Sequence, residues 1–129
     1  MKTILVICLD AERSMFMPYM HITTNVTVDE HTAELIKKQM GHAIEAIRGK
    51  SEQWLAVRVE GDAALWFAGT DEPAAVVQTG IYGSADHDEY ESLTGRICEI
   101  LDGVLSIDPA RIYVQYAETE YWGWNGRNF

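Results

Sequence analysis

A strand–helix–strand pattern of apolar residues occurs twice along the chain, and this repetition leaves few folds open. The first copy starts with residues 19–26, which are rich in the β-branched side chains that strands favour. Apolar residues then recur at helical spacing up to Ile47, and we expect Thr27 to cap this helix and Gly49 to end it. Residues 54–60 alternate between apolar and polar as a half-buried strand does.

The second copy follows a short strand that we expect at residues 63–68. Residues 74–82 read as a buried strand, residues 86–105 as an amphipathic helix and residues 111–117 as the closing strand. A right-handed crossover makes each unit a parallel pair of strands under a helix. The two units therefore predict one α/β domain of the α+β type, in which a four-stranded sheet carries both helices on one face. The aromatic tail at 120–129 is expected to form a short hairpin or a strand.

The length of 129 residues fits one domain, which we place at residues 17–129. Residues 1–16 contain an apolar run that is too short to cross a bilayer, and they lack the features of a secretory signal. They form either an extra strand or a non-essential extension, with translation starting at Met17. We favour the later start, because codons GAA-AGG-AGC at residues 12–14 would contain a bacterial ribosome-binding sequence just upstream of it.

The charge and the cysteine content exclude several classes of protein. Ten basic and twenty acidic residues give a net charge of −10, and so acidic a surface repels the phosphates of nucleic acids. Cys8 and Cys98 are too few for a disulfide framework or a zinc site, and the four histidines show no ligand spacing. We therefore expect no nucleic-acid or membrane partner, no metal and no cofactor. The expected location is the cytoplasm, or outside the cell by a leaderless route.

The predicted sheet has a second face that the helices do not cover. Side chains alternate between the two faces of a strand, so the apolar residues of these strands are not all expected to point to the helices. The residues in question are Val57, Val59, Val76, Ile112 and Val114. An oligomer that packs sheet against sheet would cover the exposed ones. Trp66 and Phe67 are expected in the core.

Several short motifs follow one another after residue 16. They are Met17-Pro18, Thr24-Asn25-Val26, Gly49-Lys50, and the segments at 67–73, 108–113 and 123–129. In this order and at this spacing, they make residues 17–129 similar to the macrophage migration inhibitory factor branch of the tautomerase superfamily. The resemblance implies a homotrimer in which three sheets line a central barrel and the active sites lie at subunit boundaries.

By this resemblance, Pro18 is a general base that takes a proton from a carbon next to a carbonyl group. A proline at the start of a chain is a secondary amine, and α-amino groups titrate at about 7.7–8.0. An apolar pocket and a neighbouring cation both lower that pKa, so that the nitrogen is neutral near neutral pH. The alternative is that Pro18 only precedes a strand. The catalytic role requires that residues 1–17 are absent, because the nitrogen is otherwise an amide.

The resemblance also implies residues that bind the substrate carboxylate. Lys50 would bind it and would lower the pKa of Pro18, although a lysine after a helix also compensates the helix dipole. Tyr82 and Gly83 stand where a backbone amide of the family binds the same carboxylate. The family commonly has an aliphatic residue in the place of Tyr82, so this side chain is a departure that narrows the pocket.

Further residues match the walls of the family's pocket. Tyr113 corresponds to a pocket-lining tyrosine of the neighbouring subunit, and Gln115 stands where the mammalian protein has a shorter amide. Packing of the strand is the alternative for both. Trp54, Trp124 and Phe129 match aromatic positions at the mouth of the pocket, where flat apolar walls suit an aryl ring.

The resulting hypothesis is a cofactor-free keto–enol tautomerase that acts on aryl 2-oxo acids, an isomerase similar to phenylpyruvate tautomerase and L-dopachrome isomerase. The alternative is a secreted, cytokine-like protein that binds a receptor and keeps a vestigial pocket, which the departures at Tyr82 and Gln115 favour. A related tautomerase of a muconate-type acid is a third reading. Ala74 and Val77 stand where the mammalian factor has a Cys-x-x-Cys, so no thiol-oxidoreductase role is expected.

Overall fold

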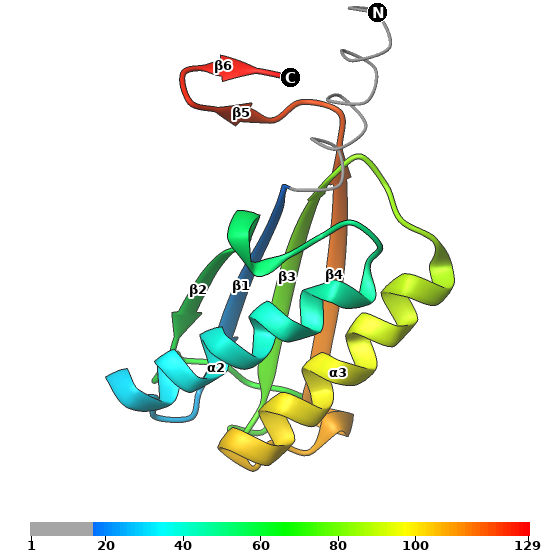
Figure 1. The fold of residues 1–129 in the computed structure, drawn as a ribbon. Coiled ribbons are helices and arrows are strands. Elements are labelled where there is room, and N and C mark those ends of the chain that lie inside the picture. Colours follow the sequence, from blue (N-terminus) through cyan, green and yellow to red (C-terminus); the bar gives the residue numbers. More distant parts are fainter. Residues whose placement is uncertain (1–16) are drawn as a thin grey trace, which may run out of the picture.

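The computed structural model describes residues 17–129, which form a four-stranded sheet with two helices on one face (Figure 1). The strands are β1 (Pro18–Thr24), β2 (Ala56–Glu60), β3 (Ala75–Tyr82) and β4 (Ile112–Thr119), in the order β2-β1-β3-β4. β1 runs parallel to β2 and β3 parallel to β4, while β1 and β3 are antiparallel. The predicted α+β fold is confirmed. The expected extension at 1–16 lies outside the described residues.

Helix α2 (Glu30–Ala43) has its N-cap two residues later than predicted. The Asp29 carboxylate accepts the backbone N–H of Thr32 at 2.7 Å, which makes Asp29 the N-cap residue. The hydroxyl of Thr27 instead donates to the Asp62 carboxylate at 2.6 Å. The predicted cap at Thr27 was therefore wrong, because a partner 35 residues away holds this side chain.

The first helix does not end at Gly49 as predicted, because α2 ends at Ala43 and a 3-10 turn follows it. A short 3-10 turn at Ile44–Ala46 continues α2, and a second 3-10 turn at Glu52–Trp54 precedes β2. Gly49 lies between the two turns with a φ of +84°, a left-handed conformation that glycine adopts at little cost. The glycine thus reverses the chain after the helix rather than ending the helix itself.

Helix α3 (His87–Leu105) starts at a capping box. Asp86 is its N-cap residue, and the Glu89 carboxylate accepts the backbone N–H of Asp86 at 3.0 Å. A third 3-10 turn at Pro109–Arg111 leads into β4. The chain ends in the predicted hairpin, made of β5 (Gly123–Trp124) and β6 (Arg127–Asn128), which lies beyond one end of the sheet (Figure 1).

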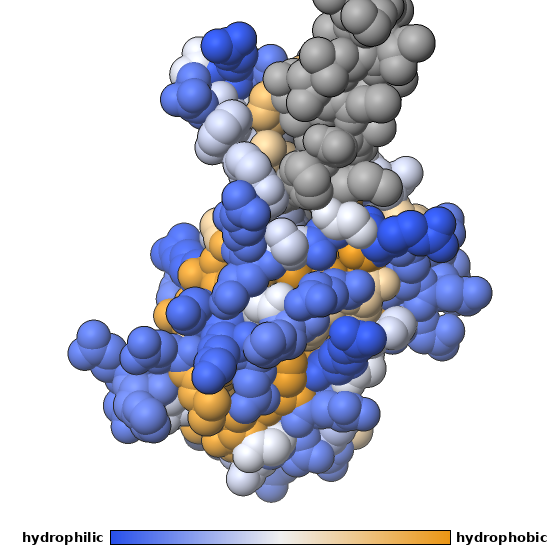
Figure 2. All heavy atoms as spheres, in the orientation of Figure 1, coloured by the Kyte–Doolittle hydropathy of each residue, from blue (hydrophilic) through white to orange (hydrophobic). Residues whose placement is uncertain are grey.

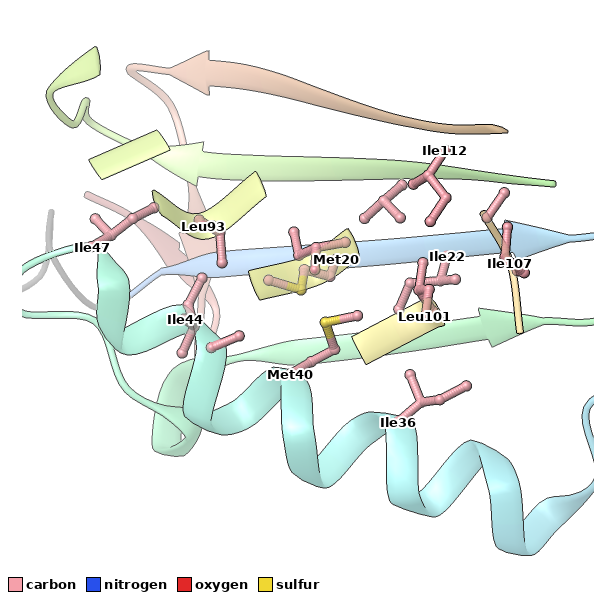
Figure 3. Close-up of a cluster of buried hydrophobic side chains, with 14 of the residues drawn as sticks. Met20, Ile22, Ile36, Met40, Ile44, Ile47, Leu93, Leu101, Ile107 and Ile112 are labelled. Carbon is pink, nitrogen blue, oxygen red and sulfur yellow. The ribbon is translucent and has the colours of Figure 1, made fainter. Parts of the chain in front are cut away.

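The hydrophobic core fills the space between the sheet and the two helices (Figure 3). Side chains from β1, α2 and α3 meet there with no exposed surface, among them Met20, Ile22, Ile36, Met40, Leu93, Ile97 and Leu101. Full burial of one such side chain contributes about 1.5–3 kcal/mol. The periodicities that predicted the helices therefore correspond to real buried faces.

The uncovered face of the sheet is more polar than we expected. Ile112 is buried in the core, and Val57, Val59 and Val114 pack against the core. Of the five apolar residues considered above, only Val76 lies on the opposite face, because side chains alternate along β3. Alternation along β1 and β2 places polar groups on that face as well. They include the Glu60 carboxylate, which contacts His21 at 2.9 Å and Arg58 at 2.7 Å. The strand composition therefore gives less support to an oligomer than predicted, and the trimer stays a prediction.

Residues 63–68 do not form the expected strand, and this part of the chain contains one isolated bridge, between Phe67 and Thr70. Side chains from outside the segment bind the carbonyl groups that a neighbouring strand would otherwise pair. The Asn25 amide donates to the carbonyls of Leu65, Asp71 and Glu72 at 2.9–3.1 Å. The Arg111 guanidinium donates to those of Phe67, Thr70, Glu72 and Pro73 at 2.9–3.3 Å.

The same loop keeps two aromatic residues out of the core. Trp66 is 64 % exposed, and Phe67 is half-buried against Tyr113, with ring centroids 4.7 Å apart. The prediction that Trp66 and Phe67 are core residues was therefore wrong for this chain. The loop instead presents an aromatic group beside the start of β4.

Hydrophilic side chains dominate the helical face of the molecule, with apolar residues visible between them (Figure 2). Between residues 17 and 129, no helix combines the length and the apolar character needed to cross a membrane. Nor does that part of the chain bring three histidine, cysteine, aspartate or glutamate side chains together as a metal site would.

Candidate active site

Pro18 lies at the end of the sheet where the other predicted carboxylate-binding residues also lie. Pro18 is the first residue of β1 and pairs with Ile81 near the end of β3. Tyr82 and Gly83, which follow Ile81, therefore lie at the same end of the sheet. Tyr19 pairs with Ala56, the first residue of β2, and the loop that carries Lys50 therefore enters the sheet at this end as well. The structure thus gathers these segments from three separate parts of the sequence (Figure 1).

The backbone N–H of Tyr82 already has a partner in this chain. It donates to the carbonyl oxygen of Met17 at 3.1 Å, and Met17 is only 3 % exposed. The nitrogen of the buried Pro18 is the amide nitrogen that follows this carbonyl. While Met17 is present, the predicted donor is occupied and the predicted base has no basic lone pair.

Lys50 is a buried cation, which is uncommon for a lysine without a specific role. The residue is 4 % exposed, and burial lowers the pKa of Lys50 to about 8, against a smaller opposing effect of the Glu89 charge. Compensation of a helix dipole does not explain the burial, because α2 ends at Ala43 and the dipole acts within the last turn. The environment fits a lysine that binds an anion.

Glu89 is a residue of this region that the sequence did not reveal. Its carboxylate accepts the backbone N–H of Arg48 at 2.6 Å, in addition to the N–H of Asp86. These hydrogen bonds lower the pKa of Glu89, helped by the nearby charges of Arg48 and Lys50. Nothing in the sequence relates Glu89, at the start of a helix, to a loop 41 residues away.

The aromatic residues of the tail form a continuous cluster with those near the end of the sheet. Trp54 meets Trp124 edge to face at 5.2 Å, Trp124 meets Phe129 at 6.1 Å, and Phe129 meets Tyr82 at 5.9 Å between ring centroids. Trp122, which we did not single out, adds a contact to Tyr82 at 6.4 Å. Trp54, Trp124 and Phe129, the residues predicted for the aromatic wall, therefore come together within one chain.

Tyr113 and Gln115 are not brought to this site within one chain. Tyr113 pairs with Val76, five residues along β3 from the partner of Pro18, which separates them by about 17 Å along the strand direction. Gln115 lies on the uncovered face, where its side-chain oxygen accepts a hydrogen bond from Gln78 at 3.5 Å. With Tyr113 64 % exposed, both side chains are available to a second copy of the chain.

Comparisons with known proteins agree with this arrangement. Residues 17–129 match the family model described as macrophage migration inhibitory factor (MIF). The mouse macrophage migration inhibitory factor is 32 % identical over 121 residues, which cover 88 % of this chain and 99 % of the mouse protein. A homolog from Brugia malayi is 27 % identical over 104 residues, covering 81 % of this chain and 90 % of the homolog.

The fold comparison gives the same answer. The crystal structure of Leishmania major MIF2 superposes with a TM-score of 0.83 at 27 % identity, covering 88 % of this chain and 98 % of that one. A MIF-like protein from Entamoeba histolytica reaches a TM-score of 0.78 at 22 % identity, with 87 % and 98 % covered, and supports the fold alone. From Met17 to its last residue, the chain belongs to the macrophage migration inhibitory factor family of the tautomerase superfamily.

Proposed function

We propose that this chain, once Pro18 is its first residue, is a cofactor-free keto–enol tautomerase of aryl 2-oxo acids, similar to phenylpyruvate tautomerase and L-dopachrome isomerase. The observation that carries the proposal is the buried Lys50 at the end of the sheet where Pro18 opens β1. A buried cation lowers the pKa of a nearby amine and also attracts a carboxylate. Both effects serve a proton transfer next to a carbonyl group of an anionic substrate.

In the proposed reaction, the Pro18 nitrogen takes a proton from the carbon next to the ketone. The electron pair of the broken C–H bond forms the carbon–carbon double bond of the enol, and the carbonyl oxygen receives the proton that Pro18 returns. Lys50 and the N–H of Tyr82 hold the carboxylate, while Trp54, Trp124 and Phe129 hold the aryl ring. A base whose pKa lies near the working pH contributes about 10²- to 10⁴-fold to the rate.

Removal of Met17 is a required step of this proposal. It turns the amide nitrogen of Pro18 into an amine, and it also frees the Tyr82 N–H from the Met17 carbonyl. We propose that residues 1–16 are a non-essential extension and that 17–129 is the functional domain. The intact mass of the chain from its native source tests this step, since it reports which residue is first.

The activity is tested by following loss of the phenylpyruvate enol with three chains that lack residues 1–17. The unchanged chain and the Pro109→Ala control should be active, because Pro109 lies in a 3-10 turn before β4. Pro18→Ala should lose at least about 100-fold in kcat/KM. Catalysis no faster than in buffer, or an unchanged rate in Pro18→Ala, would rule the enzyme out.

A second candidate is a cytokine-like binding protein with a vestigial pocket. The occupied N–H of Tyr82 favours it, since a chain that keeps Met17 has neither the base nor this donor available. Such a protein would show no turnover, and the Pro18→Ala variant would bind a receptor as well as the unchanged chain does. A native mass that includes Met17 would favour this candidate over the enzyme.

A further inference from the structure

Glu89 connects the start of α3 to the loop that carries Lys50. One carboxylate oxygen accepts the N–H of Arg48 at 2.6 Å, and the other accepts the N–H of Asp86 at 3.0 Å. Hydrogen bonds to a charged acceptor are stronger than neutral ones, and short N–H···O distances are typical of them. A single side chain therefore ties together two backbone segments that lie far apart in the sequence.

The segment from Ile47 to Lys50 is a tight turn with a hydrogen bond of its own. The backbone N–H of Lys50 donates to the carbonyl of Ile47 at 3.1 Å, and Gly49 between them has a left-handed backbone. Glu89 binds this turn from the outside, at Arg48. The backbone of Lys50 is thus fixed by its own turn, and the turn is fixed against α3.

The charge of Glu89 also acts on the Lys50 ammonium group. Burial favours the neutral amine and lowers the pKa of Lys50 to about 8, whereas the negative charge of Glu89 opposes this effect. The other charged group on this loop is Arg48, which acts on Glu89 in the same direction as Lys50 does. In the processed chain the terminal amine of Pro18 would be a further titrating neighbour. A neutral lysine holds a carboxylate poorly, so the charge state of Lys50 matters for binding.

We propose that Glu89 is a positioning residue for Lys50, which fixes the Arg48–Lys50 turn and keeps the lysine in its cationic form for the substrate carboxylate. The role in substrate binding rests on the proposed function. The link between Glu89 and Lys50 does not, and it can be measured in a chain that shows no turnover.

The first experiment titrates the four lysines of the full-length chain by NMR of the ¹³Cε atoms. In Glu89→Gln, the pKa of Lys50 should fall by about 0.5–1 unit, since its neighbouring negative charge is gone. Asp86→Asn is the matched control, because it removes the same charge from the same helix start and leaves an asparagine that still caps well. The control should leave Lys50 unchanged, and the exposed Lys37 and Lys38 should titrate alike in all three chains.

A second variant separates position from charge. Glu89→Asp keeps the charge but shortens the side chain, so it should hold the pKa of Lys50 closer to that of the unchanged chain than Glu89→Gln does. In chains that start at Pro18, Glu89→Gln should raise KM for phenylpyruvate about tenfold, with a smaller change in kcat. The alkaline limb of its kcat/KM profile should also move to lower pH.

An unchanged Lys50 titration in Glu89→Gln, or an equal shift in Asp86→Asn, would overturn the proposal. A merely structural role would lower the melting temperature in both variants without moving Lys50 in either. If no chain shows turnover while Lys50 shifts only in Glu89→Gln, the tautomerase function fails and the link between Glu89 and Lys50 stands.

Discussion

Lys50 is only 4 % exposed, and burying a lysine has a cost in folding free energy. The pKa of Lys50 is lowered from 10.5 to about 8, which means that the folded state disfavours its charge. A shift of this size corresponds to at most about 3 kcal/mol of unfolding free energy at neutral pH. Burial of this charge is therefore unfavourable for folding at neutral pH, and perturbed pKa values of this kind cluster at functional sites.

Replacing Lys50 should show this cost directly. Between pH 8 and pH 10.5 the unfolded chain holds the lysine proton more tightly than the folded chain does, so stability should rise with pH in that window. We expect Lys50→Met to be about 1–3 kcal/mol more stable than the unchanged chain at pH 7, with the difference shrinking as pH rises through the window. Urea unfolding at several pH values measures it, with the exposed Lys38→Met as the control.

A second residue-scale prediction concerns the aromatic wall. Trp124 is 47 % exposed and contacts Trp54 and Phe129, so Trp124→Ala should remove a wall of the pocket at little cost to the core. We expect KM for phenylpyruvate to rise about 5- to 20-fold, equivalent to about 1–2 kcal/mol, with less than about 1 kcal/mol lost from unfolding stability. Tyr121→Ala is the control, because this side chain is 76 % exposed. Equal kinetics in the two variants would contradict the assignment of the wall.

At the scale of elements, the periodicity of the sequence predicted most helices and strands. It could not predict the segments whose structure depends on side chains from distant parts of the chain. β1, β3, α3 and β4 lie within two residues of their predicted bounds, because alternation and helical spacing report which face is buried. The loop at 63–73 was beyond reach, since its order comes from Asn25 and Arg111, about 40 residues away on either side. The same reason hid Glu89. The resemblance pointed to Pro18 and Lys50 as site residues, and the structure places both at one end of the sheet.

The tie from Arg111 to this loop can be tested by its removal. Its guanidinium donates to four carbonyl groups and lies over the Phe67 ring, 5.2 Å from the centroid. Arg111→Met keeps an unbranched apolar stem but no donor, and it should cost about 2–3 kcal/mol of unfolding free energy. Arg96→Met, on the exposed surface of α3, should cost less than about 0.5 kcal/mol. Urea unfolding of both variants and of the unchanged chain measures the losses. Equal losses of unfolding free energy in the two variants would mean that the hydrogen bonds of Arg111 do not stabilise the fold.

At the scale of the whole molecule, one chain brings together only some of the residues predicted for the site. Pro18, Lys50 and the aromatic wall are together, while Tyr113 lies about 17 Å away along the strand direction. If Tyr113 serves the site of a neighbouring copy, a chain lacking Pro18 and a chain lacking Tyr113 should complement each other. Mixed and reassembled trimers of Pro18→Ala and Tyr113→Ala should regain about a quarter of full activity, since chance assembly pairs both intact residues at that frequency.

The measurement is phenylpyruvate turnover before and after joint unfolding and refolding, with sedimentation to confirm the trimer. Each variant refolded alone serves as the control. Activity of the mixture equal to the mean of the two separate samples would show that each site is built within one chain, and a monomer in sedimentation would contradict the assembly as well.

The hydrogen bond from Tyr82 to the Met17 carbonyl has a practical outcome for anyone who purifies this protein. An affinity tag fused ahead of Pro18 should give material without tautomerase activity, because the Pro18 nitrogen would stay an amide and the Tyr82 N–H would stay occupied. A tag at the C-terminus is also unfavourable, because the last residue, Phe129, contacts Tyr82 with ring centroids 5.9 Å apart. A leader that a protease or an aminopeptidase removes completely would leave Pro18 as the first residue. A lack of tautomerase activity in that sample would then be informative.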